Sequence, residues 1–195
     1  MNAEWVTAVG TVGTFAVILA SAVAALLQLR HMRGSNQIVA LTECRETLES
    51  PAFREAQHFV SYELPNRLKD PQEARKAAVL PFQGEYQALG TIANFFESMG
   101  VFVKHRIIDR EIGCDLWAYV VLRNWEALLP VTTYVRRELH NEALWENFEY
   151  LANMCRRYIE RDRSAYPRKI PRMPKDHSLC ELVDGETASV SGGKV

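Results

Sequence analysis

Residues 5–29, WVTAVGTVGTFAVILASAVAALLQL, contain no charged side chain. A helix over this segment would be about 37 Å long, which exceeds the roughly 30 Å of a bilayer's hydrocarbon core. The hydroxyl groups that interrupt the segment can donate hydrogen bonds to helix carbonyls, so they cost little in lipid. The segment therefore predicts one transmembrane helix.

Two other interpretations of this segment fit less well. A cleaved signal peptide begins with Lys or Arg, whereas residues 1–4 read MNAE. The core helix of a soluble protein is rarely free of charge over such a length. We therefore expect the segment to be retained as a membrane span.

The charges that flank the span predict its orientation. Arg30 and Arg33 follow it and Glu4 precedes it, and positive charge gathers on the cytoplasmic side of a membrane. We expect residues 1–4 to be extracytoplasmic and the chain from residue 30 onward to be cytoplasmic, beneath the inner (plasma) membrane. The protein would then be a single-pass membrane protein, oriented N-out and C-in.

Small residues recur along the span. Ala16, Ala20 and Ala24 are four residues apart, so they lie on one face of the helix. Such a row lets two membrane helices approach closely, and it favours a helix–helix interface and a homo-oligomer. Alanine is also common in membrane helices that do not associate, and the sequence leaves both interpretations open.

Residues 30–164 read as a cytoplasmic helical bundle. Residues 35–49 either continue the membrane helix or begin a new one after Gly34. Ser50-Pro51 and Asp70-Pro71 each combine a capping side chain with a proline in the first helical turn. Asp109 is expected to cap the helix that begins at residue 110, and Asn141 to cap the last helix of the bundle.

Four residue patterns predict where helices end. Pro65 is expected to stop the helix that begins at Pro51, and Gly100 to end a later helix as its C′ residue. Residues 101–108, VFVKHRII, read as an extended connector, because this β-branched run lies between two helices and has no partner strand. Pro130 is expected to bend or end the following helix.

The resulting fold class is all-α: one N-terminal transmembrane helix, a small antiparallel bundle of about four main helices, and a tail. Trp125 and Phe148 are the expected centre of the core, because each lies on an apolar helix face. The companions of Trp125 are Cys114, Trp117, Val121 and Leu128, and those of Phe148 are Leu144, Trp145, Leu151, Ala152, Cys155, Tyr158 and Ile159.

Residues 165–195 are Pro-rich and basic, then small and polar, and are expected to form a disordered tail. From Arg156 to Lys175 there are eight Lys or Arg residues and two acidic ones. A solvated helix end explains this charge as well as contact with an anionic lipid leaflet does. The candidates for lipid contact are Arg30, Arg33, Arg168, Lys169, Arg172 and Lys175. Nucleic-acid binding is less favoured, because no recognition motif accompanies the charge.

No catalytic signature is present. The cysteines Cys44, Cys114, Cys155 and Cys180 form no CxxC pair, and in a reducing cytosol they should be free thiols. Glu55 and His58 form a single E-x-x-H, whereas a di-iron bundle needs two such motifs and further carboxylates. His105 and Asp109 could form an acid–base pair, but a capping role explains Asp109 better. We therefore predict no metal or cofactor site and no enzymatic activity.

Three stretches carry a resemblance to a known family: NFFESMGVFVKHRIID, LWAYVVLRNWEALLP and LWENFEYLA, which together fall within residues 94–152. The chain resembles an uncharacterised bacterial family, domain of unknown function 4760, over most of residues 1–160. The resemblance implies one N-terminal membrane helix and a short cytoplasmic helical domain. It implies no activity, and its motif residues Glu97, Gly100, Trp125 and Phe148 look structural or interfacial.

Three functions fit these observations. The first is a membrane-anchored, non-enzymatic helical interaction module with an unknown protein partner. The second is a membrane effector, of the kind found in stress or phage-defence systems, that self-associates through Ala16, Ala20 and Ala24. The third is a metal-dependent helical-bundle enzyme that uses Glu55 and His58 or His105 and Asp109.

Overall fold

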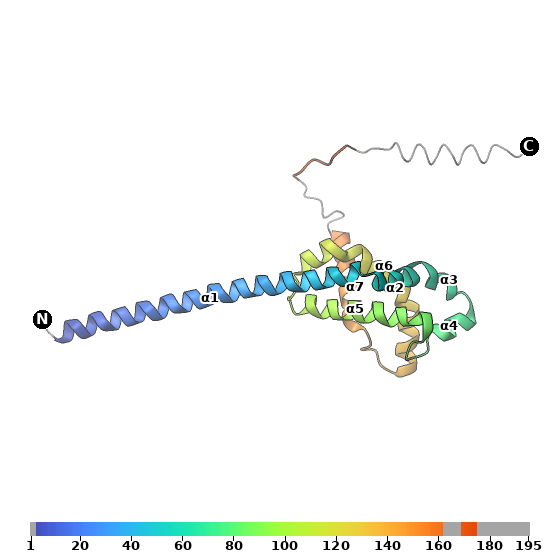
Figure 1. Ribbon diagram of the computed structural model, residues 1–195, viewed down its shortest axis with the longest axis horizontal. Helices are drawn as coiled ribbons and strands as arrows, with labels where there is room; N and C mark the ends of the chain where they lie inside the picture. The colour runs from blue at the N-terminus through green and yellow to red at the C-terminus, as the bar shows by residue number, and fades with distance from the viewer. Residues whose placement is uncertain (1–2, 162–168, 175–195) are drawn as a thin grey trace, which may run out of the picture. The chain divides into compact units, whose positions relative to one another are not determined.

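A computed structural model of the chain describes residues 3–161 and 169–174, apart from the side chains of residues 3–9, 30, 31 and 33. The described residues form helices and turns and no strand (Figure 1). This confirms the predicted all-α fold class. The chain divides into two units, Met1–Arg163 and Ser164–Val195, and all the helices described below belong to the first.

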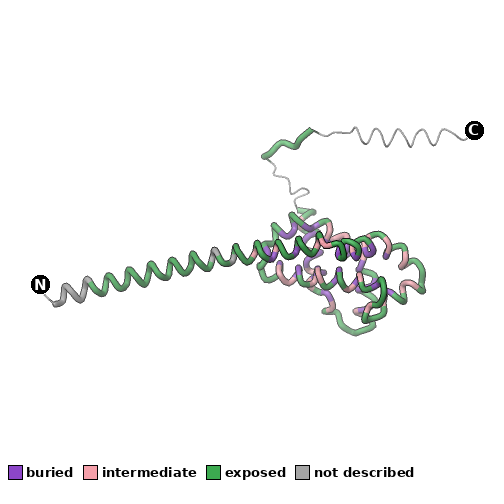
Figure 2. Tube along the Cα trace, in the orientation of Figure 1, coloured by how far each residue is buried: buried purple, intermediate pink, exposed green. Residues whose placement is uncertain are grey.

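The first helix, α1, runs from Ala3 to Glu49 without a break, a length of about 70 Å. The alternative left open at Gly34 is thus decided in favour of one continuous helix. Every side chain of residues 10–29 is exposed, whereas Ala40 and Cys44, further along α1, are buried in the bundle (Figure 2). The same helix therefore provides the apolar segment and part of the bundle core.

Two of the hydroxyls in the apolar segment are bonded within α1, as expected. Thr14 Oγ1 donates to the Gly10 carbonyl at 2.9 Å, and Ser21 Oγ donates to the Val17 carbonyl at 2.8 Å. These bonds leave neither hydroxyl in need of water, which suits a segment surrounded by lipid.

The prediction that Pro65 stops the second helical segment is wrong. α2 (Pro51–His58) begins at Ser50, whose side chain accepts from the Phe53 N–H as predicted, and continues through a π-helical turn (Phe59–Glu63) into α3 (Leu64–Arg67). In that turn the Leu64 N–H donates to the Phe59 carbonyl, five residues back. The wider turn lets the chain stay helical around the proline, which cannot donate a hydrogen bond of its own.

α4 (Pro71–Ala77) begins at Asp70 as predicted, since its carboxylate accepts from the Gln72 N–H at 2.8 Å. A short 3₁₀ turn (Gly84–Tyr86) then leads into α5 (Gln87–Lys104).

Gly100 does not end α5, and the predicted connector 101–108 is half helix. Residues 101–104 continue α5, and only residues 105–108 form the connector. The helix ends where Arg106 takes a left-handed backbone conformation (φ 58°) and the Ile107 N–H donates back to the Phe102 carbonyl at 2.8 Å. Gly100 instead lies directly against the Asn147 backbone at the start of α7, so the missing side chain serves packing and not termination.

α6 is one helix from Arg110 to Leu139. Asp109 caps it as predicted, with one carboxylate oxygen accepting from the N–H groups of Glu111 and Ile112 at 2.9 and 3.2 Å. Pro130 lies inside this helix and does not end it. Buried residues on both sides of the proline explain the continuity, because they pack both halves of α6 against the core: Val121, Leu128, Val131 and Val135.

Asn141 does not cap the last helix. Its side chain accepts from the Ala143 N–H at 3.1 Å in a turn, and α7 begins five residues later and spans Glu146–Arg161. Leu144 and Trp145 therefore precede α7, and Trp145 has a left-handed backbone (φ 56°). Ile159 was predicted to lie on the apolar face with Phe148, and this prediction is wrong because Ile159 is exposed.

The core centres on Phe96, Trp125 and Phe148, contributed by α5, α6 and α7. Phe96 and Phe148 are stacked with ring centroids 4.9 Å apart, and Trp125 meets Phe148 edge-on at 5.0 Å. Trp125 is 5% exposed and Phe148 fully buried, as the sequence predicted for both. Aromatic contacts of this kind add to the free energy gained by burial alone.

Candidate functional site

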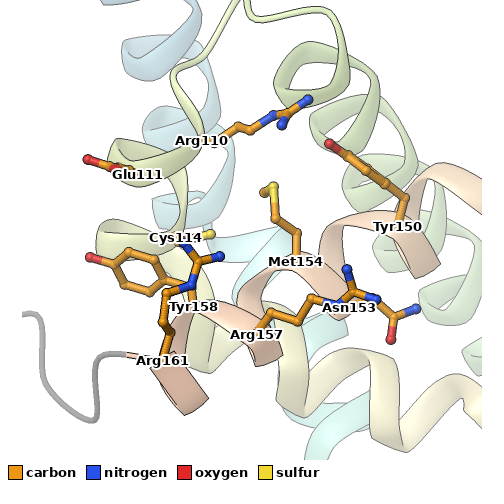
Figure 3. A pocket seen from close by; sticks show the side chains of 9 residues that line it. All are labelled: Arg110, Glu111, Cys114, Tyr150, Asn153, Met154, Arg157, Tyr158 and Arg161. Atoms are coloured by element: carbon orange, nitrogen blue, oxygen red, sulfur yellow. The ribbon is translucent and has the colours of Figure 1, made fainter.

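A pocket of about 620 Å³ lies between the start of α6 and the C-terminal half of α7. Its volume falls within the roughly 300–1,000 Å³ common for small-molecule sites. Figure 3 shows side chains of both helices around it. The lining residues are Arg110, Glu111, Cys114, Tyr150, Asn153, Met154, Arg157, Tyr158 and Arg161.

The two walls of the pocket are joined by contacts between α6 and α7. Tyr158 Oη on α7 donates to Asp115 Oδ1 on α6 at 2.7 Å. Beneath it, the Sγ atoms of Cys114 and Cys155 are 3.7 Å apart and both residues are buried. These contacts fix the spacing of the helices from which the lining side chains project.

The two thiols affect each other's protonation. Their hydrogen bond lowers the pKa of the Cys114 thiol and, together with burial, raises the pKa of the Cys155 thiol. Cys114 is the one that lines the pocket. Its neighbour supplies the hydrogen bond that favours the thiolate form of Cys114.

The pocket carries an excess of positive charge. Arg110 lies in the first turn of α6, and Arg157 and Arg161 lie one turn apart on α7. Glu111 is the one acidic residue among the described residues that line the pocket. Within the described part of the chain, none of the three guanidinium groups has an ion-pair partner. The sequence indicated the charge on α7, but Arg110 is 47 positions before Arg157 and only the packing of α6 on α7 brings them to one pocket.

The residues considered for metal binding lie apart. His58 Nδ1 is 3.4 Å from Glu63 Oε1 on the exposed side of its own segment. Two glutamates elsewhere in the bundle that could supply further carboxylates have other partners: Glu85 pairs with Arg67, and Glu97 binds the start of α7. Among the described residues no three His, Cys, Asp or Glu side chains are grouped so that they could hold a metal ion. Glu63 is thus the carboxylate found beside His58, and Glu55 does not complete a metal-ligand group with them.

His105 and Asp109 occupy helix ends. His105 is the exposed C-terminal cap of α5, and the Asp109 carboxylate is engaged by the first N–H groups of α6. Asp109 therefore has the capping role that the sequence favoured.

Glu97 caps α7 from a different helix. Its carboxylate oxygens accept from Asn147 Nδ2 at 2.6 Å and from the Phe148 N–H at 2.9 Å. One turn further along α5, Gly100 lies directly against the Asn147 backbone. Two of the motif residues, Glu97 and Gly100, are thus structural, and together they seat the start of α7 on α5.

Arg136 is a structural residue that sequence reasoning missed. Its side chain is 12% exposed, and it donates to the Leu144 carbonyl at 2.9 Å and to Glu149 Oε2 at 2.7 Å. Its guanidinium also lies over the Trp125 ring, 5.9 Å from the centroid. It holds the loop between α6 and α7, and no local pattern distinguishes it from a surface arginine.

The residues predicted to act at the membrane are only partly described. Ala16, Ala20 and Ala24 are exposed along α1, and Lys169 and Arg172 are exposed in the second unit. The others lie outside the described residues: Arg168, Lys175 and the side chains of Arg30 and Arg33. Most of the tail 165–195 lies outside them as well.

The fold defines a helical-bundle protein, and the described part of the chain carries one helix long and apolar enough to cross a membrane. The family model described as Domain of unknown function (DUF4760) matches residues 15–158, and the chain belongs to this family. The match extends from inside the apolar segment to the end of the bundle, which confirms the resemblance found in the sequence. No curated protein and no solved structure matches the chain.

Proposed function

We propose that this protein is a membrane-anchored, non-enzymatic interaction module. Its single span would cross the inner (plasma) membrane with the N-terminus outside and hold the helical bundle at the cytoplasmic face. Protein partners would bind to the bundle, and the bilayer would hold the apolar part of α1.

The observation that carries this proposal is the continuity of α1. The exposed apolar residues 10–29 and the buried bundle residues Ala40 and Cys44 belong to one helix. Only about 16 Å of helix separates Leu29 from Ala40. Such a tether would keep the bundle close to the bilayer, and it would transmit rotation or tilting of the span to the bundle.

An uncovered apolar face on α6 supports binding of a protein partner. Ile112, Leu116 and Tyr119 recur at helical spacing and are 41%, 58% and 73% exposed. Side chains of this kind are enriched where protein surfaces meet, and their removal from water favours association.

Two measurements test the proposal. Alkaline carbonate extraction should leave the full chain in the membrane pellet and release a chain that begins at Ser35. In affinity capture from detergent extracts, any protein recovered with the wild type should be lost with Leu116→Glu and kept with Leu139→Glu. Leu139 is a matched control because it is also exposed but lies at the far end of α6. Extraction of the full chain by carbonate, or equal recovery with both variants, would contradict the proposal.

The exposed row of Ala16, Ala20 and Ala24 favours a second function, that of a self-associating membrane effector. Ala20→Ile would place a bulky side chain in this row and should block close helix approach, whereas Ala25→Ile on another face should not. On overexpression, a membrane-potential dye should report depolarisation for the wild type and the control but not for Ala20→Ile. An intact potential in cells where the wild type is oligomeric would exclude this function.

A further inference from the structure

We propose that the pocket between α6 and α7 binds a phosphate-bearing ligand through Arg110, Arg157 and Arg161. This site lies wholly within the bundle, so the proposal holds whether or not the interaction module proposed above has a protein partner. The ligand class follows from the charge, the unused donors and the shape of the pocket.

The arrangement of charge calls for an anion. Arg157 and Arg161 are one turn apart on α7, where two like charges destabilise a helix. No described carboxylate pairs with either of them or with Arg110. By contrast, Arg156, the neighbour of Arg157 on α7, reaches Glu126 at 3.5 Å. Three cations without a described carboxylate partner thus meet in one pocket.

The donors favour phosphate over a carboxylate. An unpaired guanidinium presents a planar fork of N–H groups that suits two phosphate oxygens at once. Three such groups, with Glu111 as the one acidic residue in the described lining, can neutralise a dianion. The first N–H groups of α6 contribute little to the site, because Asp109 already accepts from two of them. Recognition therefore falls to the arginine side chains.

The rest of the pocket suits the organic part of a phosphate ester. Tyr150, Met154 and Tyr158 give it aromatic and apolar surface, and Asn153 adds an amide (Figure 3). A volume of about 620 Å³ exceeds what a single phosphate group fills. The ligand is thus a phosphate ester, and its source is either a lipid headgroup or a soluble metabolite.

The position of the pocket permits either source. Phe102, near the end of α5, lies beside Glu43, Cys44 and Thr47 of α1, and α6 begins six residues after α5 ends. Figure 1 shows the start of α6 at the end of the bundle where α1 enters it. A lipid headgroup could approach the pocket from that side, and a soluble ester could enter from the open solvent.

The test uses the full chain in a neutral detergent. Calorimetric titration with inorganic pyrophosphate should show binding by the wild type. Arg157→Ala combined with Arg161→Ala should weaken the binding by at least about tenfold, since two charged hydrogen-bond donors are removed. The control, Arg54→Ala combined with Arg75→Ala, removes the same charge from exposed positions away from the pocket and should bind as the wild type does. Thermal melts should show all three proteins equally folded, because no described carboxylate pairs with either arginine of the pocket pair.

A second arm identifies the source of the ligand. After purification in the presence of phosphatidic acid and phosphatidylcholine, mass spectrometry measures the lipid retained. Selective retention of phosphatidic acid by the wild type, lost in the pocket variant, assigns a lipid headgroup. Pyrophosphate binding without such retention assigns a soluble ester. If the wild type binds neither, or if the pocket and control variants lose binding equally, the proposal is overturned.

Discussion

Replacing Gly100 with alanine tests whether α5 and α7 pack as closely as the structure shows. A Cβ atom at this position would overlap the carbonyl oxygen of Asn147 and lie 2.6 Å from its carbonyl carbon. Both atoms belong to the backbone at the start of α7, so no side-chain rotation can relieve the overlap. The two helices would have to move apart.

The cost of this movement can be estimated from three effects. Alanine is favoured over glycine inside a helix by about 1 kcal/mol, which opposes the loss. Overpacking a well-packed site typically costs about 1–3 kcal/mol. Separation of the helices would also stretch the bonds from Glu97 to Asn147 and Phe148, and hydrogen bonds to a charged group contribute about 1.5–3 kcal/mol each. Because the two bonds are stretched and not lost, only part of their energy counts, and a net destabilisation of about 2–4 kcal/mol follows, which lowers Tm by roughly 5–15 °C for a chain of this size.

Thermal melts of the full chain in detergent, followed by circular dichroism, measure the effect. Gly113→Ala is the matched control, because Gly113 is also a buried helical glycine. A Cβ at Gly113 would meet only the methyl groups of Val103 and Ile108, at 3.4 and 3.5 Å. This variant should melt at the wild-type temperature or slightly above. The reasoning is refuted if Gly100→Ala melts within about 1 °C of the wild type, or if the two variants lose the same stability.

Three further predictions follow from the fold and the sequence. In urea melts, Trp125→Ala and Phe148→Ala should each lower the free energy of unfolding by about 3–5 kcal/mol, whereas His105→Ala, at an exposed helix cap, should change it little. A larger loss for His105→Ala would make that histidine part of a buried network. A C-terminal alkaline phosphatase fusion should be inactive, since the phosphatase would stay in the cytoplasm, and periplasmic activity would overturn the N-out orientation. In a Cys180→Ser background, mild oxidation should form a disulfide between Cys114 and Cys155, whose Sγ atoms are 3.7 Å apart. Peptide mapping would detect this disulfide. A disulfide that involves Cys44 instead would contradict the packing of α6 on α7.

Helix starts were predictable where the signal is local. Ser50, Asp70 and Asp109 each accept a hydrogen bond from an N–H two or three residues ahead. Such a bond depends on the identity of one residue and on the backbone of its immediate neighbours. No other part of the fold has to be known for it to form. The apolar span is predictable for the same reason, because its length and lack of charge are properties of a single segment.

Two of the errors have a different cause. Gly100 and Pro65 are residues that end helices in isolation, yet both lie inside helical segments here. At Gly100 the backbone of α7 occupies the space that a side chain would need. The cap expected from Asn141 is supplied by Glu97, which is 44 positions earlier in the chain. The outcomes at Gly100 and Asn141 depend on a partner that is distant in sequence, so the local pattern could not decide them. At Pro65 the chain stays helical through the π-helical turn that precedes the proline.

The candidate site follows the same rule, and this explains why the basic run on α7 could be seen and the pocket could not. From the sequence alone, Arg157 and Arg161 are interpreted as part of a solvated helix end, because the sequence does not show that α6 lies beside them. The contact of Cys114 with Cys155 and the bond from Tyr158 to Asp115 place it there. Arg110 then becomes the third cation of the pocket because Asp109 starts α6 at that point. A local cap thus fixes where Arg110 stands, and packing between distant helices turns three exposed arginines into one site.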